Sequence, residues 1–509
     1  MKFSVIPCKL SRQGLSREFS LDALMTNQPT SAPPAPAAAK PPEPKPDPKP
    51  EISEMMAKAR QAMKAIEHYD QAQADMLVMA IGWAVVKEKE ALAKIAVEEG
   101  GFGNVEDKIT KIRLRVTGTI QDMKSIKTVG VVEVDPVKQL VKIAKPVGVV
   151  AAIIPSTGPD ATPPMKALCA LKGKNAIIVA AHPKTQKSSE LAVNLMRNGC
   201  RAIGVPEDLI QIIQKPSIAK TQELMRQSDL VVATGGVDMV KSAYSSGTPA
   251  YGVGVGNTVH IVDETADLDD AALMITRGKT FDYATSCLAD NAVVAHASIY
   301  DALVEKMVKL GAYICTPEEK ARLQKVMWPT GGAIPSLDVI AKSAPYVAKL
   351  ANIDLPEGRT YLVVKEDGAG PEHPFSGEKL SLVLALYKYH DPFKNAVDWV
   401  NKITGYQGLG HSCGIHTKND KHVDELAFNT KTGRVMVNQN MNEGAGGPRN
   451  GLPFTLSLSC GTWGRNITTE NVNARMFVNL TWVSRILPTP KPIPTDDALF
   501  AEYWAKYGK

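Results

Sequence analysis

The feature that most constrains the fold is an alternation of short apolar runs with helical segments, which begins near Val147. The runs are rich in β-branched residues and poor in charge. Strands that are apolar on both faces and joined through helices are typical of a parallel sheet covered by helices on both sides. We therefore expect an α/β fold that contains a doubly wound domain, with its ligand at the carboxyl ends of the strands. Strands are predicted at 147–154, 176–180, 209–213 and 230–234, with helices at 165–172 and 188–201.

Further segments complete the folded body. Apolar residues three and four apart predict two helices over 51–100 and another over 107–126. Two runs that flank Asp135-Pro136 predict a hairpin over about 128–144. A second α/β region follows over about 263–438. Its predicted strands lie at 292–295, 359–364 and 382–387, and one long strand is predicted at 475–487.

A proline-rich segment separates this body from the N-terminus. Ten of the 35 prolines lie in the 22 residues Pro29–Pro50. Such a composition cannot bury apolar surface and predicts an extended, semi-rigid linker. Before it, Leu15–Met25 has apolar residues at helical spacings, which fits a small amphipathic docking helix. A disordered terminus and an organelle transit peptide are the alternatives for residues 1–50.

Composition excludes several classes of function. The formal net charge is +6, half of it lies in the first 50 residues, and no basic cluster with aromatics suggests nucleic acid. The longest apolar run, Met76–Val86, has 11 residues, too few to cross a membrane. Seven scattered cysteines without a C-x-x-C pair argue against disulfides and structural zinc and favour a reducing, cytoplasmic setting. We expect no metal, no nucleic acid, no membrane and no secretory signal.

Two local patterns suggest chemistry. Thr234-Gly235-Gly236 ends a predicted strand and opens the predicted helix Val237–Tyr244. Backbone N–H groups at such a place can approach a phosphate, and a tight structural turn is the alternative. Cys287 lies between a helix that ends near Lys279 and a strand that begins near Ala292. A thiolate at a helix start would have a lowered pKa and act as a nucleophile, although a lone cysteine is more often a buried structural residue.

Eight segments in order resemble the CoA-acylating branch of the aldehyde dehydrogenase superfamily over essentially the whole body. They are Ile154-Pro-Ser-Thr-Gly-Pro, Ala181-His-Pro-Lys184, Ala233-Thr-Gly-Gly236, Gly252-Val-Gly-Val-Gly-Asn257, Phe281-Asp282 with Cys287, Gly377-Glu-Lys-Leu-Ser381, Gly408-Leu-Gly-His411-Ser, and Leu458-Ser-Cys-Gly-Thr-Trp-Gly464 with Glu470-Asn471. The resemblance implies an aldehyde dehydrogenase fold. A Rossmann-like cofactor domain would span 51–265, an α/β catalytic domain 266–460 and a C-terminal segment 461–509. The hairpin and the strand at 475–487 would form a β oligomerisation element of a dimer or tetramer.

The resemblance also implies a reaction. Cys287 matches the family's nucleophile, which forms a thiohemiacetal with an aldehyde. Hydride transfer to NAD or NADP leaves a thioester, which CoA converts to acyl-CoA, and the reaction is reversible. Hydrolytic relatives carry a general-base Glu where Gly252–Asn257 has no carboxylate, which favours CoA over water. A hydrolytic enzyme that uses Asp282 or Asp290 as its base, and a non-catalytic scaffold on this fold, are the alternatives.

The same resemblance assigns further residues. His411 matches the family's Gly-His and either assists proton transfer or lines the site. Glu378 matches the residue that binds the nicotinamide ribose. No acidic residue near Lys184 would reject a 2′-phosphate, so NADP stays open beside NAD. The other cofactor-binding candidates are Ser156, Thr157, His182, Pro183, Thr234, Gly235, Gly236, Gly256 and Asn257.

One departure from the family concerns Gly158, which replaces the usual Asn that is similar in position to an oxyanion donor. Ser156, Thr157 or Thr285 would replace this donor, or the Cys287 backbone N–H would work with a different helper. The alternative is that Gly158 makes room for a bulky or charged substrate head group.

The substrate and the partners are suggested only by resemblance and loop charge. Arg449 and Arg465 lie in late loops and could pair with an anionic aldehyde. The C-terminal segment resembles the subgroup that includes acylating sulfoacetaldehyde dehydrogenase, and acetaldehyde or propionaldehyde is the alternative substrate. Microcompartment members of the family often carry an N-terminal docking helix on a flexible linker. The tail has that layout, so shell proteins are an expected partner and the inside of a bacterial microcompartment an expected location.

Overall fold

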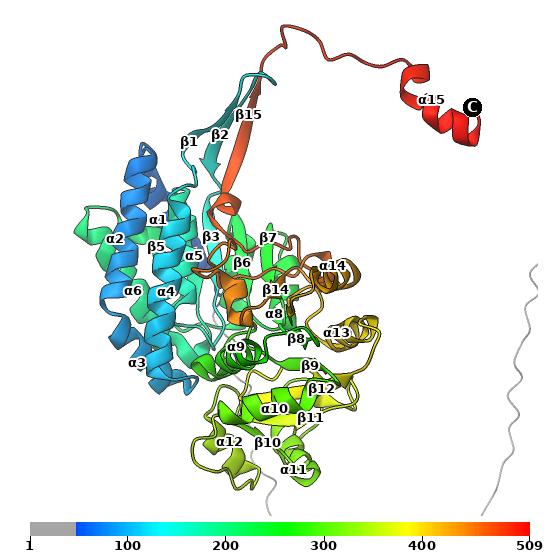
Figure 1. Cartoon of the computed structure of the whole chain (residues 1–509). Helices are drawn as coiled ribbons and strands as arrows, with labels where there is room; N and C mark the ends of the chain where they lie inside the picture. The colour runs from blue at the N-terminus through cyan, green and yellow to red at the C-terminus, as the bar shows by residue number, and fades with distance from the viewer. Residues whose placement is uncertain (1–46) are drawn as a thin grey trace, which may run out of the picture. The chain divides into compact units, whose positions relative to one another are not determined.

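The computed structural model describes residues 47–509, so the expected docking helix and most of the proline-rich linker lie outside the described residues. The described part contains three sheets (Figure 1). Their strand orders are β5-β4-β3-β6-β7, β10-β11-β12-β9-β8-β13-β14 and β1-β2-β15. The α/β prediction is confirmed.

The five-stranded sheet is parallel throughout. Its strands are β3 (Val149–Ile153), β4 (Ala176–Ala180), β5 (Ile210–Ile212), β6 (Leu230–Thr234) and β7 (Ala250–Val253). The helices α5 (Thr162–Lys172), α6 (Gln186–Ala202), α7 (Ile218–Gln227) and α8 (Val237–Tyr244) connect them. Strand order reverses between β3 and β6, which is where a doubly wound sheet binds its ligand.

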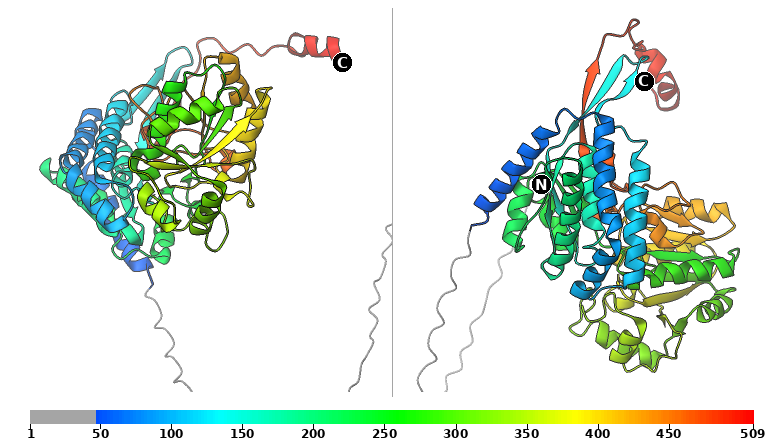
Figure 2. Two further views of the ribbon diagram at one scale, coloured as in Figure 1. Left: turned by 60° about the horizontal axis from the view of Figure 1, so that its bottom comes forward. Right: turned by 90° about the vertical axis from the view of Figure 1, so that its left-hand side faces the viewer.

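Four helices precede this sheet: α1 (Lys49–Ala65), α2 (Gln71–Lys87), α3 (Lys89–Gly100) and α4 (Val105–Met123). The prediction of two helices over 51–100 is wrong, because Asp70 and Gln73 form a reciprocal capping box that starts α2 anew, and α3 begins after a break at Glu88. α1 begins at Lys49, so the last two residues of the expected linker are helical. Figure 2 shows α1–α4 on one side of the molecule.

The seven-stranded sheet is also parallel. Its strands are β8 (Val259–Val262), β9 (Ala292–His296), β10 (Ala312–Ile314), β11 (Tyr361–Lys365), β12 (Val383–Tyr389), β13 (Cys413–His416) and β14 (Val435–Val437). Its helices are α9 (Leu268–Thr280), α10 (Tyr300–Lys309), α11 (Pro317–Met327), α12 (Ala344–Leu350), α13 (Lys394–Tyr406) and α14 (Asp420–Asn429). Residues 254–258 join the carboxyl end of β7 to the amino end of β8, so these edges of the two large sheets adjoin.

The third sheet is an antiparallel arm of β1 (Gly130–Asp135), β2 (Leu140–Pro146) and β15 (Val478–Ser484) that projects from the larger sheets (Figures 1 and 2). The hairpin prediction is confirmed. The strand predicted at 475–487 is too long at both ends, because Ala474–Phe477 forms a 3₁₀ turn capped by Asn473 and β15 ends at Ser484. Beyond the arm lies α15 (Asp496–Tyr507), which the sequence analysis did not predict.

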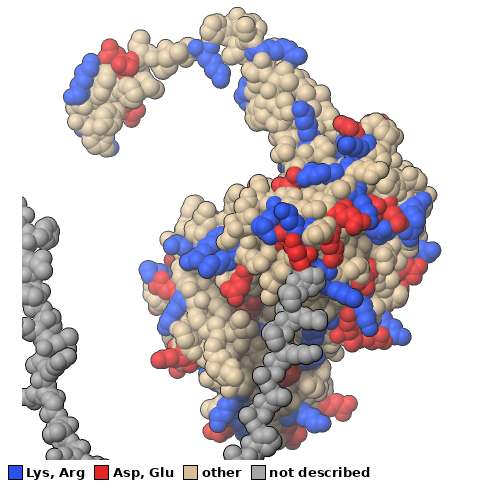
Figure 3. Space-filling model, turned by 180° about the vertical axis from the view of Figure 1, so that it is seen from behind, with Lys and Arg blue, Asp and Glu red and all other residues tan. Residues whose placement is uncertain are grey.

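The surface carries charges of both signs. In Figure 3, Lys and Arg side chains are interspersed with Asp and Glu over the visible face. This agrees with a body whose formal charge is close to neutral for its size. Within residues 47–509, no helix combines the length and apolar character needed to cross a membrane.

Candidate active site

The structure brings the two predicted catalytic residues together where the two large sheets adjoin. Cys287 precedes β9 and His411 precedes β13, two neighbours of β8. The His411 Nε2 atom lies 3.2 Å from the Cys287 Sγ atom. Cys287 is half-buried and His411 is fully buried. A thiol and an imidazole at hydrogen-bond distance form the arrangement expected for nucleophilic catalysis by cysteine.

The electrostatic setting of Cys287 differs from the expectation of a lowered pKa. Burial and the nearby Glu378 raise the pKa of the thiol well above its usual value, while Arg434 opposes this shift. The expectation is wrong because Cys287 lies in a buried turn between η3 (Phe281–Ala284) and β9, not at the start of a helix. Burial and the charge of Arg434 lower the pKa of His411 to about 3, so its imidazole is neutral at pH 7.

Gly256 and Glu378 form one wall beside the nucleophile. The Gly256 N–H donates to Glu378 Oε1 at 3.0 Å. Burial raises the pKa of Glu378 to about 8, and the hydrogen bond from Gly256 opposes that shift. A Cβ on Gly256 would lie 2.6 Å from the Cys287 Cβ and overlap the Cys287 carbonyl oxygen. Only glycine therefore lets this backbone approach the nucleophile.

A buried ionic cluster holds the turn that leads to Cys287. Asp282, Tyr283 and Ala284 have φ values of 48°, 50° and 60°, a region that non-glycine residues seldom adopt. Asp282 Oδ2 accepts hydrogen bonds from Lys111 at 2.8 Å and Lys108 at 3.1 Å. The two lysines come from α4, so helices beside the first sheet fix a strained turn of the second.

Thr285 and Asn257 are candidates whose polar atoms already have protein partners. The Thr285 hydroxyl donates to Asp282 Oδ2 at 2.7 Å. The Asn257 amide nitrogen donates to carbonyl groups of Ser376 and Gln407, and its oxygen accepts from Asn291. Asn257 is fully buried. The structure gives Asn257 a positioning role below Gly256 and leaves its side chain no free polar atom for a cofactor.

The two carboxylates considered as substitute bases are likewise engaged. Asp282 belongs to the cluster described above. Asp290 is fully buried, pairs with His260 and accepts the Met441 N–H at 3.3 Å. Neither carboxylate is free to activate water, and Gly252–Asn257 carries none.

Five of the predicted cofactor residues gather at the switch point of the first sheet. Ser156 and Thr157 follow β3, and Thr234-Gly235-Gly236 links β6 to α8. The Thr234 hydroxyl is buried without a protein partner, and the space around Gly236 is open. An orphaned hydroxyl beside a helix N-terminus fits a phosphate-bearing dinucleotide. His182 and Pro183 are exposed on the turn after β4, where His182 Nδ1 accepts the Lys184 N–H at 3.1 Å.

The arginines proposed for substrate recognition lie on the surface. Arg449 is exposed and its guanidinium approaches the Met274 sulfur at 3.7 Å, while Arg465 is exposed at a positive φ of 59°.

Sequence reasoning missed two buried arginines, Arg115 and Arg434. Arg115 Nη1 donates to the carbonyl groups of Ala445 and Gly446. The one sequence signal for its burial is its position on α4, one helical turn after the buried Lys111.

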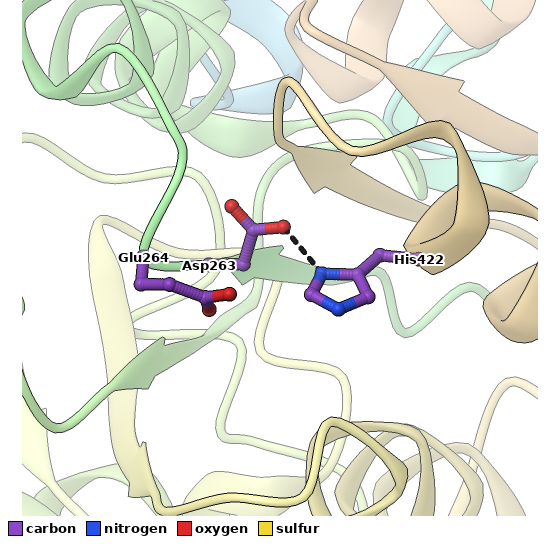
Figure 4. A group of neighbouring side chains, drawn as sticks. All are labelled: Asp263, Glu264 and His422. Atoms are coloured by element: carbon purple, nitrogen blue, oxygen red, sulfur yellow. Dashed lines mark hydrogen bonds and ion pairs between the residues drawn. The ribbon is translucent and has the colours of Figure 1, made fainter.

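The described residues include two groups with the side chains to contact a metal, Asp263 with Glu264 and His422, and Glu366 with Asp367 and His373. In Figure 4, Asp263 and His422 face each other. Asp263 accepts hydrogen bonds from His422 Nδ1 at 2.7 Å and from the hydroxyls of Thr265 and Thr417. Its oxygens are thus occupied, and the first group is a hydrogen-bond network at the end of β8.

Comparison with known proteins identifies the family of this chain. Residues 44–316 match the model of the aldehyde dehydrogenase family. The acylating sulfoacetaldehyde dehydrogenase of Bilophila wadsworthia is 45% identical over 90% of this chain and 99% of its own. The crystal structure of an acetylating aldehyde dehydrogenase from Geobacillus thermoglucosidasius aligns with a TM-score of 0.84 at 35% identity, covering 88% of this chain and 98% of that one.

A propionaldehyde dehydrogenase from the fucose-utilisation microcompartment of Clostridium phytofermentans aligns with a TM-score of 0.77 at 28% identity, covering 85% of this chain and 97% of that one. The fold, the thiol–imidazole pair and these matches agree. The chain belongs to the acylating, CoA-dependent branch of the aldehyde dehydrogenase family.

Proposed function

We propose that this enzyme converts sulfoacetaldehyde, CoA and NAD⁺ to the acyl-CoA and NADH, with Cys287 as the nucleophile. The observation that carries the chemistry is the contact of Cys287 with His411, beside which Asp282 and Asp290, the two carboxylates considered as substitute bases, are engaged in buried ion pairs and hydrogen bonds. The 45% identity to an acylating sulfoacetaldehyde dehydrogenase supports the substrate. Acetaldehyde or propionaldehyde is the alternative, and NADP is the alternative cofactor.

The chain's own residues have distinct roles in this proposal. The Cys287 sulfur attacks the aldehyde carbon, and the C–S bond forms as the carbonyl π pair moves to oxygen. A bound nicotinamide would supply the hydride acceptor. Glu378 would accept hydrogen bonds from the ribose, and Thr234 and Gly236 would hold the pyrophosphate at the start of α8; the buried, unpartnered Thr234 hydroxyl supports the second role. His411, neutral at pH 7, would accept a hydrogen bond from the CoA thiol. When the CoA sulfur attacks the thioester carbon, its proton passes to water, the C–S bond to Cys287 breaks and the electron pair returns to the Cys287 sulfur.

We further propose that Arg115 recognises the anionic head group. It is 7% exposed, and within residues 47–509 it forms no ion pair, although the charge of Glu443 opposes the lowering of its pKa by burial. Its carbonyl partner Ala445 packs in one apolar cluster with Leu288, which Cys287 also contacts. A buried guanidinium near the nucleophile suits a sulfonate, which it can bind with two parallel hydrogen bonds. Arg449 is the second candidate.

An aldehyde panel tests these assignments. The wild type should form acyl-CoA from sulfoacetaldehyde only when CoA is present, with NAD⁺ and NADP⁺ compared in parallel. Arg115→Gln should lower kcat/KM for sulfoacetaldehyde by about 10–100-fold, because a charged hydrogen bond contributes about 1.5–3 kcal/mol. Arg449→Ala serves as the matched comparison. An equal loss on acetaldehyde and propionaldehyde would contradict anion recognition, and carboxylate release without CoA would contradict the acylating route.

We also propose that the arm of β1, β2 and β15 joins protomers into a dimer or tetramer. Within residues 47–509 the outer edges of β1 and β15 have no partner strand, and Trp482 and Leu480 are 57% and 44% exposed, a combination that favours association. Light scattering should report a smaller species for Trp482→Asp.

For the N-terminal segment we propose docking to microcompartment shell proteins. Removal of residues 1–46 should leave kinetics unchanged and end co-purification with shell proteins, and a loss of folding would contradict a separate tail.

A further inference from the structure

Arg434 is a buried cation that the reaction described above leaves without a role. It directly precedes β14, and it is 6% exposed. All of its hydrogen-bond acceptors are uncharged. They are Asn471 Oδ1 at 2.7 Å, the His411 carbonyl at 2.9 Å, the Ser412 hydroxyl at 3.4 Å, and the Ser459 and Thr469 carbonyls at 2.7 and 3.1 Å.

The groups that act on its charge are sulfur atoms. Burial lowers the pKa of Arg434, and the thiols of Cys460 and Cys287 oppose that shift. No carboxylate in the part of the chain that the structure describes forms an ion pair with it. A guanidinium keeps its charge at any physiological pH. Its positive charge is therefore permanent and unpaired, and its Nη1 atom donates at 2.9 Å to the carbonyl of His411, the residue whose imidazole contacts the nucleophile.

The other groups around Cys287 cannot provide that charge. Glu378 and Cys460 become negative when they ionise and raise the pKa of Cys287. His411 contacts the sulfur, but burial and the charge of Arg434 lower its pKa to about 3. An imidazolium beside the thiolate, as in a cysteine–histidine ion pair, is thus disfavoured in this site.

We propose that Arg434 is a positioning residue that supplies the fixed positive charge for the Cys287 thiolate, while His411 stays neutral and hydrogen-bonds to the sulfur. When the S–H bond breaks, the proton passes to water and the electron pair stays on sulfur. That pair forms the bond to the aldehyde carbon. Through its bond to the His411 carbonyl, Arg434 also holds the segment that places the imidazole against the sulfur.

The test is the pH dependence of Cys287 alkylation by iodoacetamide in the full-length enzyme, followed on the Cys287 peptide by mass spectrometry. In Arg434→Gln the apparent pKa should rise by about 1–2 units, which slows alkylation at pH 7 by about 10–100-fold. Arg434→Lys keeps the charge and loses most of the hydrogen bonds, so its apparent pKa should stay within about half a unit of wild type. Equal shifts in both variants, or none in Arg434→Gln, would overturn the proposal.

Two further variants separate charge from folding. Arg359 also donates to backbone carbonyl groups, those of Val308 and Ala312, but at β10 and far along the second sheet. Arg359→Gln should leave the alkylation profile unchanged. If Arg434→Gln does not fold, the alkylation profile of the His411→Ala variant tests the proposal instead. Its profile should move by less than half a unit, and a shift of about one unit or more would identify an imidazolium as the counter-charge and overturn the proposal.

Discussion

Replacing Asp282 with Asn should lower the free energy of unfolding by about 3–5 kcal/mol, because it removes one carboxylate from a buried cluster and leaves two ammonium groups with one partner. Lys108 and Lys111 both donate to Asp282, and Lys111 also pairs with the buried Asp160 at 3.1 Å. The two carboxylates raise the pKa of Lys111 above its usual value. Asp282 and both lysines are at most 8% exposed, so water cannot take over the missing contact.

The same substitution should reduce kcat by about 10²-fold or more, since a displacement of about 1 Å at a reacting atom has that effect. Urea unfolding and steady-state kinetics measure both losses. Asp269→Asn is the matched control, because Asp269 pairs with Lys306 on the surface at 83% side-chain exposure. It should change stability by less than about 1 kcal/mol. A similar loss in both variants would contradict a special role for the buried cluster.

Replacing Gly256 with Ala should abolish most activity while the protein still folds. The added methyl would overlap the carbonyl oxygen of Cys287 and lie 2.6 Å from its Cβ. The backbone of the nucleophile must then move, which we expect to cost about 1–3 kcal/mol of stability and about 10²-fold in kcat/KM. The alkylation rate of Cys287 and the turnover number are the measurements.

Gly405 provides the control for this prediction. It lies in α13, and a Cβ there would meet no atom within 4 Å. Gly405→Ala should leave kcat unchanged and stabilise the helix by up to about 1 kcal/mol. Full activity of Gly256→Ala would show that the backbone beside Cys287 adjusts freely, against the packing described here.

Much of the fold was accessible from the sequence because its signals are local. Near-continuous apolar strands such as Ala176–Ala180 predict a parallel sheet, and the structure confirms it. α15 was missed because none of its residues is buried, so no amphipathic face distinguishes it. The helix count before residue 100 failed because the break at Glu88 has no side-chain cap and no Gly or Pro to mark it in the sequence.

The active site was likewise predictable only in part. Motifs predicted Cys287 and His411 through a family resemblance, and the structure places them in contact. The contacts that support them join residues far apart in the chain. Lys111 meets Asp282 across 171 residues, and Arg434 meets Asn471 across 37. No periodicity or spacing encodes such a pair. Asn257 belongs to one of the matched motifs, but only the structure shows that its amide nitrogen donates to backbone carbonyl groups.

The bond between α4 and the strained turn has a consequence for how this sequence can change. Lys108 and Lys111 neutralise and anchor Asp282, the first residue of the turn 282–284 with its unusual φ values. A charge lost at one end leaves an isolated charge buried at the other. The two segments must therefore vary in concert during evolution, and a chimera that takes α4 from one relative and the turn from another inherits a mismatched pair unless both charges are preserved.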